Sequence, residues 1–173
     1  MSNEKQNWGP ATQMVHGGTM RSSFGETSEA MFLTQGFVYD SAEAAEARFK
    51  GEDDGYVYSR YANPTVTMFE TRMCMLEGAE AAKATASGMA AVAAAMLCQV
   101  KAGDHVVAAR CAVSAHAAGL SKHCYQLMAP TNPTLEVIDI AHVVSVAHAC
   151  GAKVVLDNVF RYAYFSKANG IRR

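Results

Sequence analysis

Residues 139–157 read DIAHVVSVAHACGAKVVLD, and this stretch decides the fold class. Asp139 can cap a helix, and Gly151 can end it. Between them, apolar residues recur on one helical face: Ile140, Val143, Val144 and Ala147. The apolar run 153–156 follows at once and is typical of a buried strand. A helix that leads directly into a buried strand predicts an α/β domain with a mainly parallel sheet and flanking helices.

The same alternation continues toward the N-terminus. Helices are predicted at 42–50 with Asp40 as the cap, at 64–77 after the capping Asn63, and from Gly88 to about Val100. The second of these helices carries one apolar stripe, formed by Val66, Phe69, Met73 and Leu76. Strands are expected at 105–109 and 124–128. Segment 110–129 shows no clean period, and one helix with one short strand would fit it, since a minimal crossover needs about a dozen residues.

The chain of 173 residues is long enough for one domain with a real core. Residues 1–39 show no sustained periodicity, so we expect an extended N-terminal arm that lies against another surface. The predicted organisation is an arm with a short helix over 1–55 and an α/β domain over 56–173.

Composition excludes several functions. A net charge of −1 gives no argument for nucleic acid or an anionic membrane as a partner. The longest apolar stretch, 89–100, is too short to span a bilayer, and the polar N-terminus has no signal-peptide core. The five cysteines form no C-x-x-C pair, and three fall in predicted helices. They indicate reduced, buried thiols in a cytoplasmic protein.

Candidate site residues follow from the predicted sheet, because ligands in open α/β sheets bind beyond the carboxyl ends of the strands. Asp157 lies there, and so does Ser87-Gly88, where a helix begins whose unpaired N–H groups favour an anion. Tyr58 and Arg60 alternate along a segment expected to be extended, so their side chains could grip a phosphate together. Each feature alone has a plainer reading: a helix cap, a solvated arginine, a turn aspartate.

Together, several motifs occur in order along the chain: His16–Thr19, Tyr58–Thr65, Leu76–Ala79, Ala86–Ala91, Ala102–Val106, Pro130–Thr134 and Asp157-Asn158. This set resembles the pyridoxal 5'-phosphate (PLP) enzymes of cysteine and methionine metabolism, in their cystathionine γ-synthase-like branch. The resemblance covers about residues 11–110 and 129–160. Residues 25–51 and 129–139 are most similar to O-succinylhomoserine sulfhydrylases. The resemblance to this family implies that the chain forms part of the large domain of fold type I. It also implies an activity of methionine biosynthesis, γ-replacement on an activated homoserine.

The resemblance also implies roles at the cofactor. The helix start at Ser87, Gly88 and Met89 would offer backbone N–H groups to the PLP phosphate. Asp157 would pair with the pyridinium nitrogen, so that the ring can act as an electron sink. Asn132 would contact the phenolic oxygen of the ring.

Two further residues would act between subunits. Tyr58 and Arg60 would reach the phosphate held by a neighbouring subunit, which makes a dimer necessary for a complete site. Family members are tetramers, and an amino acid is the small-molecule substrate. We therefore expect a homo-oligomer.

The sequence departs from the family pattern at the catalytic lysine. The Schiff-base lysine should follow Asp157 by about two dozen residues in a Ser-x-x-Lys context. Lys167 follows too soon and lacks that context, and Lys122 precedes Asp157. No catalytic lysine is therefore assigned, and we expect the chain to be inactive alone, as a fragment of the family enzyme.

Segment 110–129 departs from the family pattern as well. Cys111–Ser114 offers no aromatic to stack on the ring. Family members carry a further helix and strand before the Pro-Thr-Asn-Pro loop, so the segment resembles an internal deletion of roughly forty residues, with only a minimal crossover left.

Other readings stay open. The chain could be a non-catalytic fragment that docks onto a full-length family member, or it could derive from a cystathionine γ-synthase, a cystathionine lyase or a methionine γ-lyase. A metal site built from Cys111, His116, His123 and Cys124 matches no common zinc spacing. No G-x-G-x-x-G follows a predicted strand, which argues against a dinucleotide site.

Overall fold

The computed structural model describes residues 8–108 and 122–160. Contacts divide the chain into two compact units, Met1–Ala84 and Thr85–Arg173. The predicted organisation, an arm with a short helix over 1–55 and an α/β domain over 56–173, stays a prediction.

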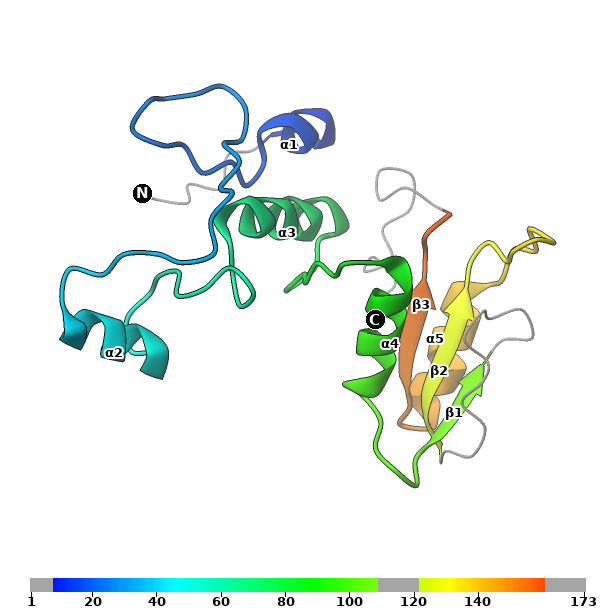
Figure 1. Ribbon diagram of the computed structural model, residues 1–173. Coiled ribbons are helices and arrows are strands. Elements are labelled where there is room, and N and C mark those ends of the chain that lie inside the picture. Colours follow the sequence, from blue (N-terminus) through cyan, green and yellow to red (C-terminus); the bar gives the residue numbers. More distant parts are fainter. Residues whose placement is uncertain (1–7, 109–121, 161–173) are drawn as a thin grey trace. The chain divides into compact units, whose positions relative to one another are not determined.

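The first unit holds three helices, α1 (Pro10–His16), α2 (Ala42–Lys50) and α3 (Pro64–Glu77), joined by extended chain (Figure 1). Helix α3 begins as predicted, because the Asn63 side chain accepts a hydrogen bond from the Thr65 N–H and Pro64 occupies the first position. Helix α2 is also where it was expected, but its cap is Ser41, which accepts from Ala44 N–H; the prediction of Asp40 was wrong. Helix α1 was not predicted.

The buried face of α3 differs from the predicted stripe. Met68 is 1% exposed, whereas Phe69 is 55% exposed and Val66 is also exposed. The N-terminal chain decides this face, because it packs on the other side of the helix: Met20 N–H contacts the Met68 sulfur at 3.1 Å. A Cβ at Gly18, whose φ is +73°, would come within 3.0 Å of the Met68 carbonyl oxygen, so only glycine allows this approach.

Arg72 of α3 ties the N-terminal arm to the helix, as the expected docking of the arm requires. Its Nε donates to the Gly17 carbonyl at 2.9 Å, and its Nη2 donates to the Thr19 hydroxyl at 3.3 Å. The guanidinium also pairs with Glu29. One cation thus holds three points of the arm, which explains the His16–Thr19 motif by packing against α3.

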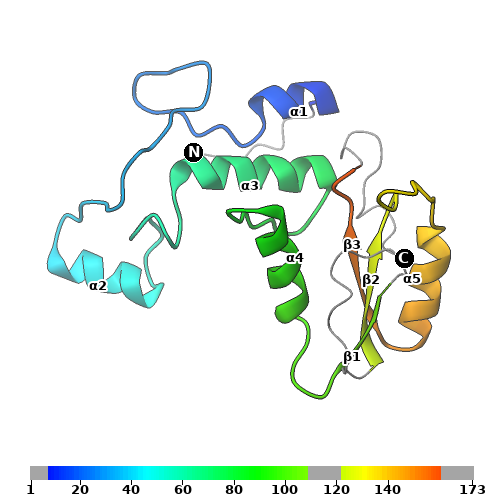
Figure 2. The same cartoon turned by 45° about the vertical axis from the view of Figure 1, so that its right-hand side comes forward.

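The second unit is an α/β layer structure built from α4 (Gly88–Leu97), β1 (His105–Ala108), β2 (Lys122–Met128), α5 (Ile140–Ala149) and β3 (Lys153–Asp157). The strands form a three-stranded parallel sheet in the order β1-β2-β3. Figures 1 and 2 show α4 and α5 on opposite faces of this sheet. The parallel pairing and the flanking helices confirm the predicted α/β architecture, and the helix expected within 110–129 falls outside the described residues.

Helix α4 runs in the direction opposite to β3. Lys153, the first residue of β3, donates from its ammonium to the Gln99 side-chain oxygen at 2.6 Å, just beyond the end of α4. A ten-residue helix and a five-residue strand both span about 15 Å. The beginning of α4 therefore lies at the carboxyl end of β3, as both ribbon views show.

The core of the second unit is small and consists largely of Met96, Cys124, Ala147 and Ala152. Cys124 is 1% exposed, and its burial raises the pKa of the thiol. Cys98 and Cys150 are exposed, so the prediction that the helical cysteines are buried was wrong for these two. Both lie where a helix ends, outside the packed face.

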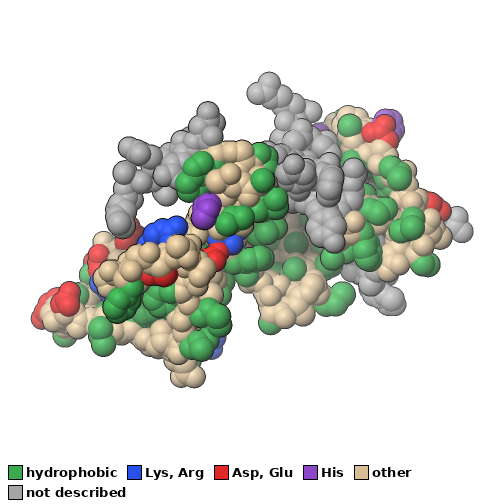
Figure 3. Space-filling model, turned by 90° about the horizontal axis from the view of Figure 1, so that it is seen from above, with side chains coloured by type: hydrophobic (Ala, Val, Ile, Leu, Met, Phe, Trp, Pro, Cys, Tyr) green, Lys and Arg blue, Asp and Glu red, His purple; other side chains and the backbone are tan. Residues whose placement is uncertain are grey.

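Large hydrophobic side chains remain exposed in both units, among them Phe24, Leu33, Leu97 and Val137. Figure 3 shows hydrophobic side chains spread over the visible face. Such apolar surface is typical of chains that pack against further protein surface. Among the described residues, no helix has the length and apolar character needed to cross a bilayer.

The buried face of α3 gives a direct test. We expect Met68→Ala to lower the free energy of unfolding of the first unit by about 2–5 kcal/mol, because it empties a packed site, and exposed Phe69→Ala to have a smaller effect. Chemical denaturation followed by the fluorescence of Trp8, which lies in this unit, measures both. If Phe69→Ala lowered the free energy of unfolding more than Met68→Ala, the stripe predicted from the sequence would be the buried face after all.

Candidate functional site

The start of α4 presents backbone N–H groups at the carboxyl edge of the sheet. The Ser87 hydroxyl accepts from the Ala90 N–H at 3.2 Å and so satisfies the third amide of the helix. The backbone N–H groups of Gly88 and Met89, the first two of the helix, remain available to another acceptor. A Cβ placed on Gly88 would meet nothing within 4 Å, so the space in front of this turn is open.

Asp157 ends β3 and is half-buried. Side chains alternate along a strand, so Asp157 leaves the sheet on the same face as Lys153, which is the face that contacts the end of α4. One carboxylate oxygen accepts from the Val159 N–H at 3.1 Å. The other oxygen has no hydrogen-bond partner within the described part of the chain. Asp157 and Gly88 thus share one edge and one face of the sheet (Figure 2).

Asn132 lies on the loop that leaves β2 at the same edge. Met128 and Asp157 are partners in the parallel register, and the Ala129 N–H donates to the Asp157 carbonyl at 3.1 Å. The loop therefore starts beside Asp157. The Asn132 side chain is exposed and available to a ligand.

Thr131, which sequence reasoning did not single out, holds this loop closed. It is 2% exposed, and its hydroxyl accepts from the Glu136 N–H at 2.8 Å and contacts the Thr134 hydroxyl at 2.9 Å. Its carbonyl accepts from the Leu135 N–H at 2.8 Å. The threonine-rich loop between two prolines is the signal from which a hydroxyl-braced turn could have been inferred.

Tyr58 and Arg60 belong to the first unit, and the structure corrects their predicted conformation. Residues 59–61 form a turn, in which the Tyr61 N–H donates to the Tyr58 carbonyl at 2.9 Å, so the argument from an extended strand was wrong. The two side chains are nevertheless together. The Arg60 guanidinium carbon lies 5.8 Å from the centre of the Tyr58 ring and 5.4 Å from that of Tyr61.

Backbone pairing fixes the position of Tyr58. It forms an isolated antiparallel bridge with Gly36, and the next residue, Ser59, donates its N–H to the Gln35 carbonyl at 2.8 Å. Arg60 is exposed and makes no hydrogen bond or ion pair with any described residue. The guanidinium is therefore exposed on a turn whose backbone is held by hydrogen bonds to residues 35–36.

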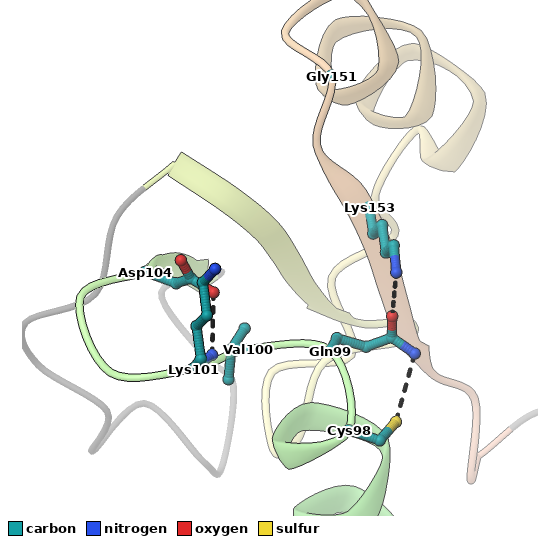
Figure 4. A pocket seen from close by; sticks show the side chains of 7 residues that line it. All are labelled: Cys98, Gln99, Val100, Lys101, Asp104, Gly151 and Lys153. Atoms are coloured by element: carbon teal, nitrogen blue, oxygen red, sulfur yellow. Dashed lines mark hydrogen bonds between the residues drawn. The ribbon is translucent and has the colours of Figure 1, made fainter.

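A hollow of about 520 Å³ lies at the opposite edge of the sheet, at the beginning of β3 (Figure 4). It is lined by Cys98, Gln99, Val100, Lys101, Asp104, Gly151 and Lys153. Inside it, Gln99 bridges the Lys153 ammonium and the Cys98 sulfur. None of the predicted site residues lines it, so this hollow is separate from the predicted site.

Other predicted groups lie partly outside the described residues. Cys111, His116 and Lys167 lie outside the described residues, and so does the stretch 111–114, which offers no aromatic residue. Among the residues that are described, no group of His, Cys, Asp or Glu could hold a metal ion.

The family model for "Cys/Met metabolism PLP-dependent enzyme" matches residues 11–128 and 112–169. An O-succinylhomoserine sulfhydrylase of Mycobacterium tuberculosis is 47% identical over 178 positions, which take in 87% of this chain and 44% of that protein. An L-methionine gamma-lyase of Porphyromonas gingivalis is 34% identical, over 92% of this chain and 47% of that protein. The chain thus spans less than half the length of these relatives.

Solved structures show the same fold. A cystathionine gamma-lyase from Lactobacillus plantarum, complexed with L-serine, superposes with a TM-score of 0.80 at 24% identity, over 95% of this chain and 48% of that one. A cystathionine gamma synthase from Xanthomonas oryzae superposes with a TM-score of 0.78 at 22% identity, over 91% and 46%. The motifs, the α/β layers and the extended match to the family model agree, and the chain belongs to the Cys/Met metabolism PLP-dependent enzyme family.

Proposed function

We propose that this chain forms the cofactor-binding part of a PLP-dependent enzyme that performs γ-replacement on an activated homoserine, as an O-succinylhomoserine sulfhydrylase does. The observation that carries the proposal is the placement of Asp157 and the start of α4 at one edge and on one face of a parallel sheet. A cofactor with a phosphate at one end and a ring nitrogen at the other needs this pair of groups.

The phosphate end fits the start of α4. The first two amides of a ten-residue helix are free of the Ser87 cap, and the open space at Gly88 lets an anion approach them. The helix dipole adds a favourable field for negative charge at this point. Gly88 and Met89 would donate their N–H groups to phosphate oxygens.

The ring end fits Asp157 and Asn132. A half-buried carboxylate with one unoccupied oxygen can hold a proton on the ring nitrogen, and the exposed Asn132 amide beside it can donate to the phenolic oxygen. When bound, PLP supplies an electron sink that stabilises negative charge at the substrate carbons. The protein contributes orientation and the retained proton.

The Tyr58–Arg60 turn supplies the remaining phosphate contact in this proposal, from a second copy of the chain. The Arg60 guanidinium makes no ion pair with the described residues and lies over the Tyr58 and Tyr61 rings, and such a cation is suited to a dianionic phosphate. A complete site then requires two copies of the chain.

The choice between the two activities follows the sequence identity to the relatives. The match to the mycobacterial sulfhydrylase is 47%, against 34% for the methionine lyase of Porphyromonas gingivalis, so replacement of a succinyl group is favoured over the lyase reaction. The substrate is then an amino acid carrying an ester at its γ-carbon.

We also propose that the connection from β1 to β2 is shortened relative to the sulfhydrylases. The alignment with the mycobacterial sulfhydrylase has 178 positions, but these take in only 87% of the 173 residues of this chain. The sulfhydrylase therefore carries residues that have no counterpart here. The family match consists of two pieces that overlap at 112–128, which supports a gap beside β2.

The ring contact can be tested with a matched pair of variants. We expect Asp157→Asn to weaken PLP binding about tenfold to hundredfold, the loss of one charge-assisted hydrogen bond. Asp139→Asn is the control, because asparagine also caps α5 and the residue lies in the same unit. Equilibrium dialysis of PLP against the purified chain measures both. Equal affinities for the two variants would exclude the proposed ring contact.

The contribution of a second copy can be tested by mixing. Arg60→Ala and Asp157→Asn chains should each bind PLP weakly. After joint refolding, random pairing leaves about one quarter of the sites with both residues intact, and these should bind tightly. Tight sites are counted by dialysis at low PLP. No recovery in the mixture would mean that Arg60 does not act across copies.

No lysine of these 173 residues stands in the Ser-x-x-Lys context expected after Asp157. We therefore expect the chain to bind PLP without a covalent bond. After treatment with PLP and borohydride, we expect denaturing dialysis to remove the cofactor completely, because neither Lys122 nor Lys167 stands in the Ser-x-x-Lys context of the family lysine. Peptide mass spectrometry detects any adduct. A stoichiometric pyridoxyl group on Lys122 or Lys167 would assign the lysine that sequence reasoning left out.

A further inference from the structure

We propose that Asn63 and Ser59 are positioning residues that set Tyr58 and Arg60 for the cofactor phosphate, with the N-terminal arm as their support. This inference rests on the proposed function and names the residues that its phosphate contact depends on. It follows from a polar network that joins the Tyr58–Thr65 motif to residues 32–35.

Asn63 is the centre of the network. Its side chain is 8% exposed, and its amide nitrogen donates to the Phe32 carbonyl at 3.0 Å and to the Ser59 hydroxyl at 3.0 Å. Its side-chain oxygen accepts from the Thr65 N–H at 2.9 Å. All the polar atoms of this buried side chain are thus in use.

Ser59 carries the network into the turn. Its N–H donates to the Gln35 carbonyl at 2.8 Å, and its hydroxyl donates to the Thr34 carbonyl while accepting from Asn63. On the other side, the Phe32 N–H donates to the Thr65 hydroxyl at 2.9 Å. The arm and the start of α3 are therefore bonded in both directions, with the turn between them.

The helix cap alone does not account for Asn63. Capping uses only the side-chain oxygen, and serine or aspartate would serve as well. The amide nitrogen is the feature that those residues lack, and it is this atom that binds the arm and Ser59. The identity of residue 63 is thus explained by the turn rather than by α3.

The neighbours of Ser59 are the two side chains that face outward. Tyr58 and Arg60 are exposed, and among the described residues of the first unit their side chains make only ring contacts. Their direction is then set by the backbone of the turn, which the network fixes on both sides. A preorganised guanidinium loses less freedom when it binds an anion, and so binds it more tightly.

The test uses two variants that remove different atoms of the network. Asn63→Ser keeps a capping oxygen and loses both amide donors; Ser59→Ala leaves the cap untouched. Each should raise the PLP dissociation constant of the chain about threefold to tenfold, the size expected for lost hydrogen bonds. Ser41→Ala, which removes the cap of α2 in the same unit, is the control and should leave the constant unchanged.

A second background separates positioning from general stability. In a chain that already carries Tyr58→Phe and Arg60→Ala, the same two variants should change the constant by less than about twofold, because the phenol hydroxyl and the guanidinium through which they act are already removed. Equal losses in both backgrounds, or no loss in the first, would overturn the inference.

Hydrogen exchange gives a readout that does not need the cofactor. Both variants should speed exchange at the amides of Ser59 and Tyr61 and leave that of Ala90, in the other unit, unchanged. Unchanged exchange at Ser59 and Tyr61 would overturn the inference even if PLP binds. Accelerated exchange in a chain that fails to bind PLP would instead locate the failure in the proposed function.

Discussion

The parallel pairing of β2 with β3 is the constraint on which the second unit depends. It places Met128 opposite Asp157 and lets the Ala129 N–H bond to the Asp157 carbonyl, so that two loops distant in sequence leave the sheet at one edge. The Lys153–Gln99 contact shows that the end of α4 lies beside the beginning of β3, so the start of the helix lies at the carboxyl end of that strand.

Each unit places a small, buried polar residue where a loop has to be held. Thr131 braces the loop that carries Asn132, and Asn63 braces the turn that carries Arg60. In both cases the side chain that would meet the ligand is exposed, and the adjacent buried residue satisfies backbone groups of the loop. A buried polar group without partners would be costly, so these networks specify one loop conformation each.

Local chemistry predicted the elements with strong end signals. Asn63-Pro64, Asp139 and the glycines at 51, 78 and 151 mark helix ends that the structure confirms, because capping is decided by neighbours in sequence. The parallel sheet was also predictable from the alternation of helices and apolar runs.

Features that depend on contacts between residues distant in the sequence could not be predicted from local sequence. The buried face of α3 depends on where the arm docks, and the turn at 59–61 depends on bonds to residues 34–36. Helix α1, at seven residues, was too short to show a period. Asp157 was predicted from strand position alone, but the face it shares with α4 required the Lys153–Gln99 contact.

The position of Cys124 on the central strand has a practical consequence. Its thiol is buried, and burial disfavours the thiolate, which is the form that attacks alkylating reagents. Cys98 and Cys150, at the helix ends, are open to the same reagents. The chain therefore carries an intrinsic probe: modification of Cys124 marks the moments when the strands separate, and its slowness relative to the two exposed thiols reports how rarely they do so.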